Sequence, residues 1–134
     1  MIRQASLNDV EIISELIQSQ EGMWQSSWSD NVLERAIKSS DGLSYVWDEG
    51  SILGFICGHD VGFRGYISDL IISKKSRRQG IAGKLVKKVE EELKLRGCHL
   101  VIADVWHEAE EFYRSLSWRP VSSSVTLLKK DLKP

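Results

Sequence analysis

Residues 66–84 read YISDLIISKKSRRQGIAGK, and this segment carries the most informative pattern in the chain. It begins with Tyr66–Ser73, a run rich in β-branched residues that predicts a buried strand. A basic segment containing Gly80 and Gly83 follows. Beyond it, apolar residues recur with the period of an amphipathic helix from about Gly80 to Leu95, at Ile81, Leu85, Val89 and Leu93. The residues therefore predict a strand, a basic loop and a long helix in that order.

The basic loop has the composition of an anion site. The first turn of a helix exposes backbone N–H groups without partners and carries about half a positive charge, so it attracts an anion. Gly80 and Gly83 have no Cβ to stand between an anion and these amides, and Arg77, Arg78 and Lys84 add positive charge. On these residues alone, a charged loop that only faces water is the competing interpretation. Neither the P-loop pattern nor the Rossmann glycine pattern occurs, which argues against nucleoside triphosphates and dinucleotides.

The rest of the chain predicts further strands and helices around this unit. The helices are expected at Val10–Ile17, Val32–Ile37 and about Glu108–Leu116, and the strands at Ile2–Arg3, Leu43–Trp47, Ile52–Gly58, Cys98–Val105 and about Val121–Leu128. Asp48–Ser51 is a hairpin turn, so the strands from Leu43 to Ser73 should form an antiparallel meander. Because a helix separates the Tyr66 and Cys98 strands, we expect them to be parallel neighbours.

Length, charge and composition exclude several classes of protein. With 134 residues and no linker, we expect one domain over residues 1–134. A net charge of −1 does not provide the basic field of a nucleic-acid binder. Acidic residues among the first sixteen exclude a signal peptide and a transmembrane helix there, so we expect a cytoplasmic protein without a membrane partner. Cys57 and Cys98 lack metal-ligand spacing, and we expect no metal.

The motif Arg77-x-x-Gly80-x-Ala82 resembles the [Q/R]-x-x-G-x-[G/A] pattern of the GCN5-related N-acetyltransferase (GNAT) superfamily. Its place after a strand and before a helix is also that of the family. The resemblance extends along the chain to Ile2–Asp9, Leu53–Ile56, Ser68–Ile72 and Phe112–Trp118.

This resemblance implies an α/β (α+β) fold with a central mixed, mostly antiparallel sheet of six to seven strands, flanking helices, and fourth and fifth strands that splay apart at a bulge. It implies an N-acetyltransferase that uses acetyl-coenzyme A (acetyl-CoA) as cosubstrate. The acceptor would be a primary amine on a small molecule, an amino acid or a protein, and the enzyme would be a monomer or a homodimer. The backbone of Leu70, Ile71 and Ile72 would bind pantetheine. The pyrophosphate would be bound by Arg77, Arg78, Gln79, Gly80, Ile81, Ala82, Gly83 and Lys84.

The resemblance also suggests catalytic residues. Tyr113 matches the family tyrosine near the coenzyme sulfur, and we expect it to be the general acid. Asp104 is the first choice for the general base. The competing candidates are Asp69, Glu21, His59, His107 and Glu108.

Two positions depart from the family pattern after the fifth strand. Trp106 stands where the family often has asparagine, and Ser117 stands where it has glycine. An acyl-CoA-binding regulatory module without catalysis is therefore the alternative function.

Overall fold

A five-stranded sheet lies at the centre of the computed structural model, which describes residues 1–133. The strands are β1 (Ile2–Gln4), β2 (Ser44–Asp48), β3 (Ile52–Asp60), β4 (Gly65–Ile72) and β5 (Val101–Ala103), and they are ordered as in the sequence. The first four pair antiparallel, and β5 pairs parallel to β4. The predicted meander and the predicted parallel pair are therefore confirmed.

The expected number of strands was too high, because the described residues contain five strands and not six to seven. The predicted strand at Val121–Leu128 is absent, and Val121, Leu127 and Leu128 are exposed. Serines interrupt the apolar run there, and the Ser124 N–H donates to the Ser122 hydroxyl at 2.9 Å. Such local side-chain bonds compete with a strand ladder. The predicted strand at Cys98–Val105 shrinks to Val101–Ala103.

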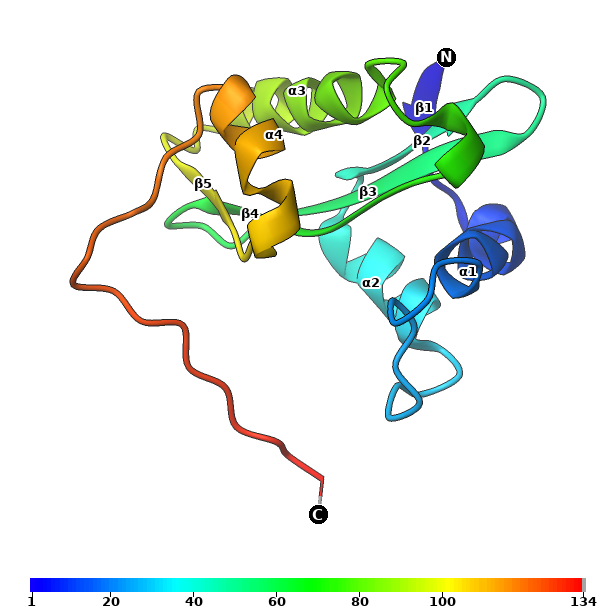
Figure 1. Cartoon of the computed structure of the whole chain (residues 1–134), viewed down its shortest axis with the longest axis horizontal. Coiled ribbons are helices and arrows are strands. Elements are labelled where there is room, and N and C mark those ends of the chain that lie inside the picture. Colours follow the sequence, from blue (N-terminus) through cyan, green and yellow to red (C-terminus); the bar gives the residue numbers. More distant parts are fainter. Residues whose placement is uncertain (134) are drawn as a thin grey trace. The chain divides into compact units, whose positions relative to one another are not determined.

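The chain divides into two units, 1–103 and the part from Asp104 onward, and each is described by itself. In the first unit, α1 (Val10–Gln18) and α2 (Val32–Ser40) cover one face of the sheet, and α3 (Ile81–Leu95) covers the other (Figure 1). Short 3-10 turns, η1 (Leu7–Asp9) and η2 (Lys74–Ser76), precede α1 and α3. No helix in the described part is long and apolar enough to cross a bilayer.

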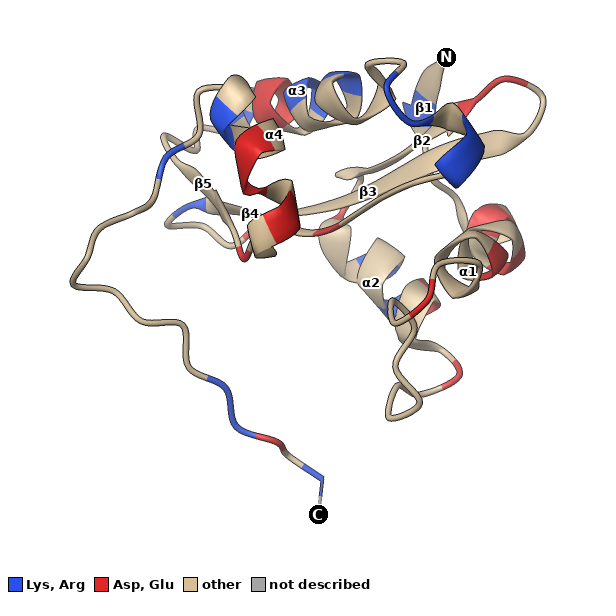
Figure 2. Cartoon of the chain, viewed as in Figure 1, with Lys and Arg blue, Asp and Glu red and all other residues tan. Residues whose placement is uncertain are grey.

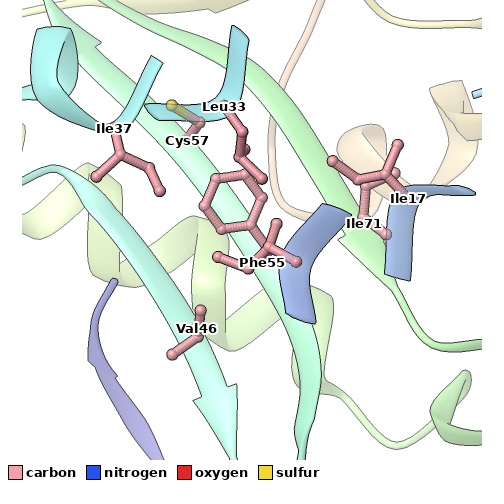
Figure 3. Packing of buried hydrophobic residues seen from close by; sticks show 8 residues of the cluster. Ile17, Leu33, Ile37, Val46, Phe55, Cys57 and Ile71 are labelled. Carbon is pink, nitrogen blue, oxygen red and sulfur yellow. The ribbon is translucent and has the colours of Figure 1, made fainter. Parts of the chain in front are cut away.

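The core between the sheet and the first two helices is centred on Phe55 of β3. Its ring lies among side chains from both helices and three strands (Figure 3). The neighbours labelled in that view are Ile17, Leu33, Ile37, Val46, Cys57 and Ile71. Ile71 is the β4 residue in this buried cluster, so the core packing anchors β4 in the sheet.

Glycines on the other face let α3 lie close to the sheet. A Cβ on Gly54 would come within 3.2 Å of the Ile81 and Leu85 side chains of α3, and one on Gly58 within 2.7 Å of Val89. Gly65 of β4 is in the same position beneath Leu93. The close approach places the first turn of α3 beside the end of β4.

The second unit contains the turn η3 (His107–Ala109) and α4 (Glu110–Ser115), close to the predicted helix at Glu108–Leu116. The ring of Tyr113 packs edge-on against Phe112 and Trp118, with 5.0 Å between centroids in each pair. Tyr113 is buried.

Candidate functional site

A β-bulge at Ser68 marks the point where β4 loses its neighbour on one side. Cys57 pairs with Asp69 and Gly58 pairs with Ile67, so Ser68 is the extra residue between them. The pairing with β5 covers only Gly65–Ile67, and it ends just before the bulge. Ser68–Ile72 therefore forms an edge that β5 does not cover, hereafter the open edge.

Strand alternation determines which backbone groups face the open edge. The Ser73 N–H donates to the Leu53 carbonyl of the β3 side at 2.8 Å. In an antiparallel ladder every second residue bonds the same neighbour, so Ile71 faces β3 whereas Leu70 and Ile72 direct their N–H and C=O groups to the open edge. The Ile71 side chain is buried in the core.

The loop that joins the open edge to α3 is basic and exposed. Its blue segment runs from η2 towards the start of α3 in Figure 2. The loop residues Arg77, Arg78, Gln79 and Gly80 are all exposed. Arg78 and Gly80 have left-handed backbones, with φ of 68° and 78°. A Cβ on Gly80 would meet nothing within 4 Å, so the space above this residue is open.

The first turn of α3 supplies backbone donors at the end of this loop. The first hydrogen bond of the helix runs from the Lys84 N–H to the Gly80 carbonyl at 3.2 Å. The amides of Ile81, Ala82 and Gly83 precede it and have no acceptor within the helix. The Ile81 side chain is buried against the sheet, which fixes the direction of the turn.

Two cations expected at this site have partners in the structure. The Lys84 ammonium lies 5.2 Å from the centroid of the Trp47 ring. The Arg77 guanidinium donates to the Gln20 side chain at 2.9 Å. The sequence analysis did not predict a role for Gln20, because this residue lies 57 residues from Arg77 and belongs to no local motif.

A cluster of three polar side chains, which the sequence analysis did not predict, lies beside the bulge. The His59 Nε2 is 2.9 Å from the Ser68 hydroxyl and 3.5 Å from the Cys57 sulfur. Burial lowers the pKa of His59, and the charge of Asp69 partly opposes this shift. Burial also raises the pKa of the Cys57 thiol. At neutral pH, His59 is therefore an uncharged imidazole.

The two expected catalytic residues both belong to the second unit. Burial, with the charge of Asp104 as the second cause, raises the pKa of Tyr113 to about 12. Asp104 itself is exposed. Tyr113 is therefore a neutral phenol at physiological pH and can donate its proton or a hydrogen bond.

Metal ligands are not gathered anywhere in residues 1–133, where no cluster of three or more His, Cys, Asp or Glu side chains could hold an ion. The chemistry that the described residues offer is that of backbone amides, cations and single acid or base groups.

A family model described as the acetyltransferase (GNAT) family matches residues 10–118. The chain belongs to the GNAT family of acetyltransferases. This match spans most of the chain, from α1 to the end of the Phe112–Trp118 motif. No curated protein sequence matches this GNAT protein.

Solved structures share the fold. A GNAT family acetyltransferase from Streptococcus pneumoniae is 22% identical with a TM-score of 0.77, and the match covers 99% of this chain and 98% of that one. Glucosamine-6-phosphate N-acetyltransferase from Arabidopsis thaliana is 21% identical with a TM-score of 0.73, covering 99% and 98%. A protein described as a transcriptional regulator from Bacillus halodurans is 22% identical with a TM-score of 0.77, covering 98% and 99%.

Acetyl-CoA is the cosubstrate of the GNAT family, and the residues of the site fit its shape. Pantetheine is an extended chain with two amides, and the open edge presents unpaired strand groups at Leu70. A diphosphate needs donors and positive charge, which the first turn of α3 and Arg78 present next to open space above Gly80.

Proposed function

We propose that this chain is an N-acetyltransferase that transfers the acetyl group of acetyl-CoA to a primary amine, by direct attack of the amine on the thioester. One arrangement supports this proposal above all. The open edge of β4 begins at the Ser68 bulge and leads, through a basic loop, to the first amides of α3, which have no acceptor within the helix. An extended amide chain that ends in a diphosphate matches these features in the same order.

Binding by backbone groups suits this ligand. Leu70 would bind the pantetheine through the N–H and C=O groups that face the open edge, and Ile72 would bind it through its N–H. The Ile71 backbone, which was expected to take part, pairs with β3, and its buried side chain fixes the strand instead. The pyrophosphate would lie on the segment from Arg77 to Lys84. Because β4 and α3 are fixed by packing, their amides need little ordering when the ligand arrives, which preserves affinity.

Two side chains of the second unit would carry the proton transfers. When bound, acetyl-CoA supplies an acetyl group activated as a thioester. Asp104 would accept a proton from the attacking amine, and Tyr113 would donate one to the leaving sulfur. The negative charge of Asp104 contributes to the high pKa of Tyr113.

The binding step is tested by titration calorimetry with coenzyme A. Gly80→Ala should weaken binding by about tenfold or more, because a methyl group would enter the open space where the diphosphate is expected. Gly50→Ala is a matched control. It too has a positive φ and open space around a Cβ, but it lies in the β2–β3 turn. Failure of the wild-type protein to bind coenzyme A would end the proposal.

Catalysis is tested with acetyl-CoA and a panel of amines that includes glucosamine 6-phosphate, free amino acids and peptides with a free N-terminus. Release of the coenzyme thiol measures turnover. Tyr113→Phe should lower kcat and leave coenzyme affinity unchanged, and unaltered turnover would remove Tyr113 from the mechanism. Tight coenzyme binding with no turnover of any amine would favour the regulatory module instead.

A further inference from the structure

Gln20 is a buried polar residue that touches both parts of the proposed coenzyme site. It follows the last turn of α1, and its exposed fraction is 8%. Its Nε2 donates to the Ile72 carbonyl at 2.7 Å, and its Oε1 accepts from the Arg77 guanidinium at 2.9 Å. One carboxamide thus connects β4 with the basic loop.

The chemistry of the two partners fixes how the amide is oriented. A backbone carbonyl can only accept a hydrogen bond, so it must face the NH2 group of Gln20. A guanidinium can only donate, so it must face the oxygen. Glutamine supplies one group of each kind at the required reach, whereas glutamate has no donor and methionine has neither group. Both bonds therefore depend on the carboxamide itself.

The contact restrains Arg77 without using up its binding capacity. Arg77 is exposed, and Gln20 takes one of its five N–H donors. The remaining donors can still bind an anion over the first turn of α3. A free arginine loses side-chain freedom when it binds, and a tethered one has lost part of it already.

The other bond closes the end of the open edge. Alternation directs the Ile72 carbonyl to that edge, and Gln20 occupies it. An extended ligand that pairs with β4 therefore has the Leu70 groups and the Ile72 N–H to bind, and beyond that N–H the Ile72 carbonyl is already taken. Arg77 is held at this same point. The side chain of Gln20 thus lies where an extended amide chain would give way to a diphosphate.

We propose that Gln20 is a coenzyme-positioning residue, which holds Arg77 towards the diphosphate and is itself held in place by its bond to the Ile72 carbonyl. This inference rests on the proposed function, because it requires the loop to bind the diphosphate of coenzyme A. It assigns a role in coenzyme binding to a residue that precedes the helix α2 and lies outside the family motif.

The test is a double-mutant cycle on coenzyme A affinity, measured by calorimetry. Gln20→Met and Arg77→Met should each weaken binding by about tenfold, the loss expected when a hydrogen bond to a charged group is removed. The double variant should bind about as weakly as Arg77→Met alone, because Gln20 acts through Arg77. Gln18→Met is the matched control, since Gln18 is an exposed glutamine of α1 that bonds only Ser14.

Each result decides the matter. Wild-type affinity in Gln20→Met, or equal losses from Gln20→Met with and without Arg77, would overturn the positioning role. If Gln20→Met does not fold, Gln20→Glu replaces it. That variant keeps an acceptor for Arg77, loses the donor to Ile72 and adds a negative charge next to the diphosphate, and its binding should also fall by about tenfold or more. If the wild-type titration itself shows no binding, it is the proposed function that fails.

Discussion

Ser117 has a backbone conformation that is unusual for a residue with a side chain. It has a φ of 72°, in the left-handed region that glycine favours. The family motif that Phe112–Trp118 resembles has glycine at this position. Ser117 therefore adopts a backbone conformation that suits glycine better than serine.

We predict that Ser117→Gly stabilises the protein. Removing the Cβ relieves about 1–2 kcal/mol of left-handed strain, whereas the added freedom of glycine in the unfolded chain costs about 0.5–1 kcal/mol. The net gain should be about 0.5–1 kcal/mol in the free energy of unfolding by urea denaturation. Ser115→Gly, at the end of α4, is the control and should be destabilising. A less stable Ser117→Gly protein would contradict this account.

His59 makes the stability depend on pH. Its pKa is lowered below the ordinary value of 6.5 in the folded protein, because burial disfavours the charged ring. Between the folded and unfolded pKa values the unfolded chain binds more protons, so stability rises with pH across that window. It should fall as the pH drops below about 6.5.

We predict that His59→Gln reduces this dependence. The free energy of unfolding of the wild type should decrease between about pH 7 and pH 5, and the variant should show a shallower decrease. The Ser68 hydroxyl, the Cys57 thiol, the Tyr66 ring and the Asp69 charge face the imidazole and remain in the variant. Identical slopes in the two proteins would show that His59 does not titrate as described.

Among the elements, the distance between α3 and the sheet sets the position of the basic loop that precedes α3. Gly58 of β3 lies directly beneath Val89 of α3, and a Cβ there would be 2.7 Å from the valine and 3.2 Å from the Leu43 carbonyl. A smaller residue at position 89 would remove the first of these contacts. The second would remain, because the Leu43 carbonyl belongs to the backbone.

We predict that Gly58→Ala destabilises the protein by about 1–3 kcal/mol, the usual cost of overpacking a core. Adding Val89→Ala to it should recover part of that loss, although Val89→Ala alone is destabilising because it leaves a cavity. Urea denaturation of the four proteins in this cycle measures the coupling. Purely additive losses would mean that α3 does not approach the sheet at Gly58 as the structure shows.

Elements whose signals are local could be predicted from the sequence. The β2–β3 hairpin follows from Asp48–Ser51, and α3 follows from its apolar period and from Gly80, so both are confirmed within a few residues. Among long-range features, the meander and the parallel β4–β5 pair were predicted correctly, and the family resemblance implied a bulge. The position of the bulge and the contacts of single side chains could not be predicted. The bulge at Ser68 depends on how β4 pairs with β3, and the bonds of Gln20 depend on three segments that only the fold brings together. The predicted strand at Val121–Leu128 was wrong because apolar alternation alone supplies no partner strand.

For the whole molecule, the amount and distribution of charge distinguish a binding site for coenzyme A from a binding site for nucleic acid. The net charge is −1, and acidic segments are interspersed with basic ones along the chain (Figure 2). Sharing a fold with a protein described as a transcriptional regulator, at 22% identity, does not bring DNA binding to this chain. Duplex binding needs several phosphate contacts over a wide basic face, whereas a diphosphate needs only one basic turn.

We therefore predict that the protein binds coenzyme A but not duplex DNA at about 0.15 M salt, where charges more than about 8 Å apart are largely screened. Anisotropy of a labelled duplex and calorimetry with coenzyme A, in the same buffer, measure the two affinities. Inorganic tripolyphosphate serves as the control polyanion. It should bind more weakly than coenzyme A, because it cannot pair with the open edge of β4. DNA binding that coenzyme A displaces would instead mean that the basic loop is a general polyanion site, since a specific cradle for one diphosphate gives a duplex too few contacts to compete.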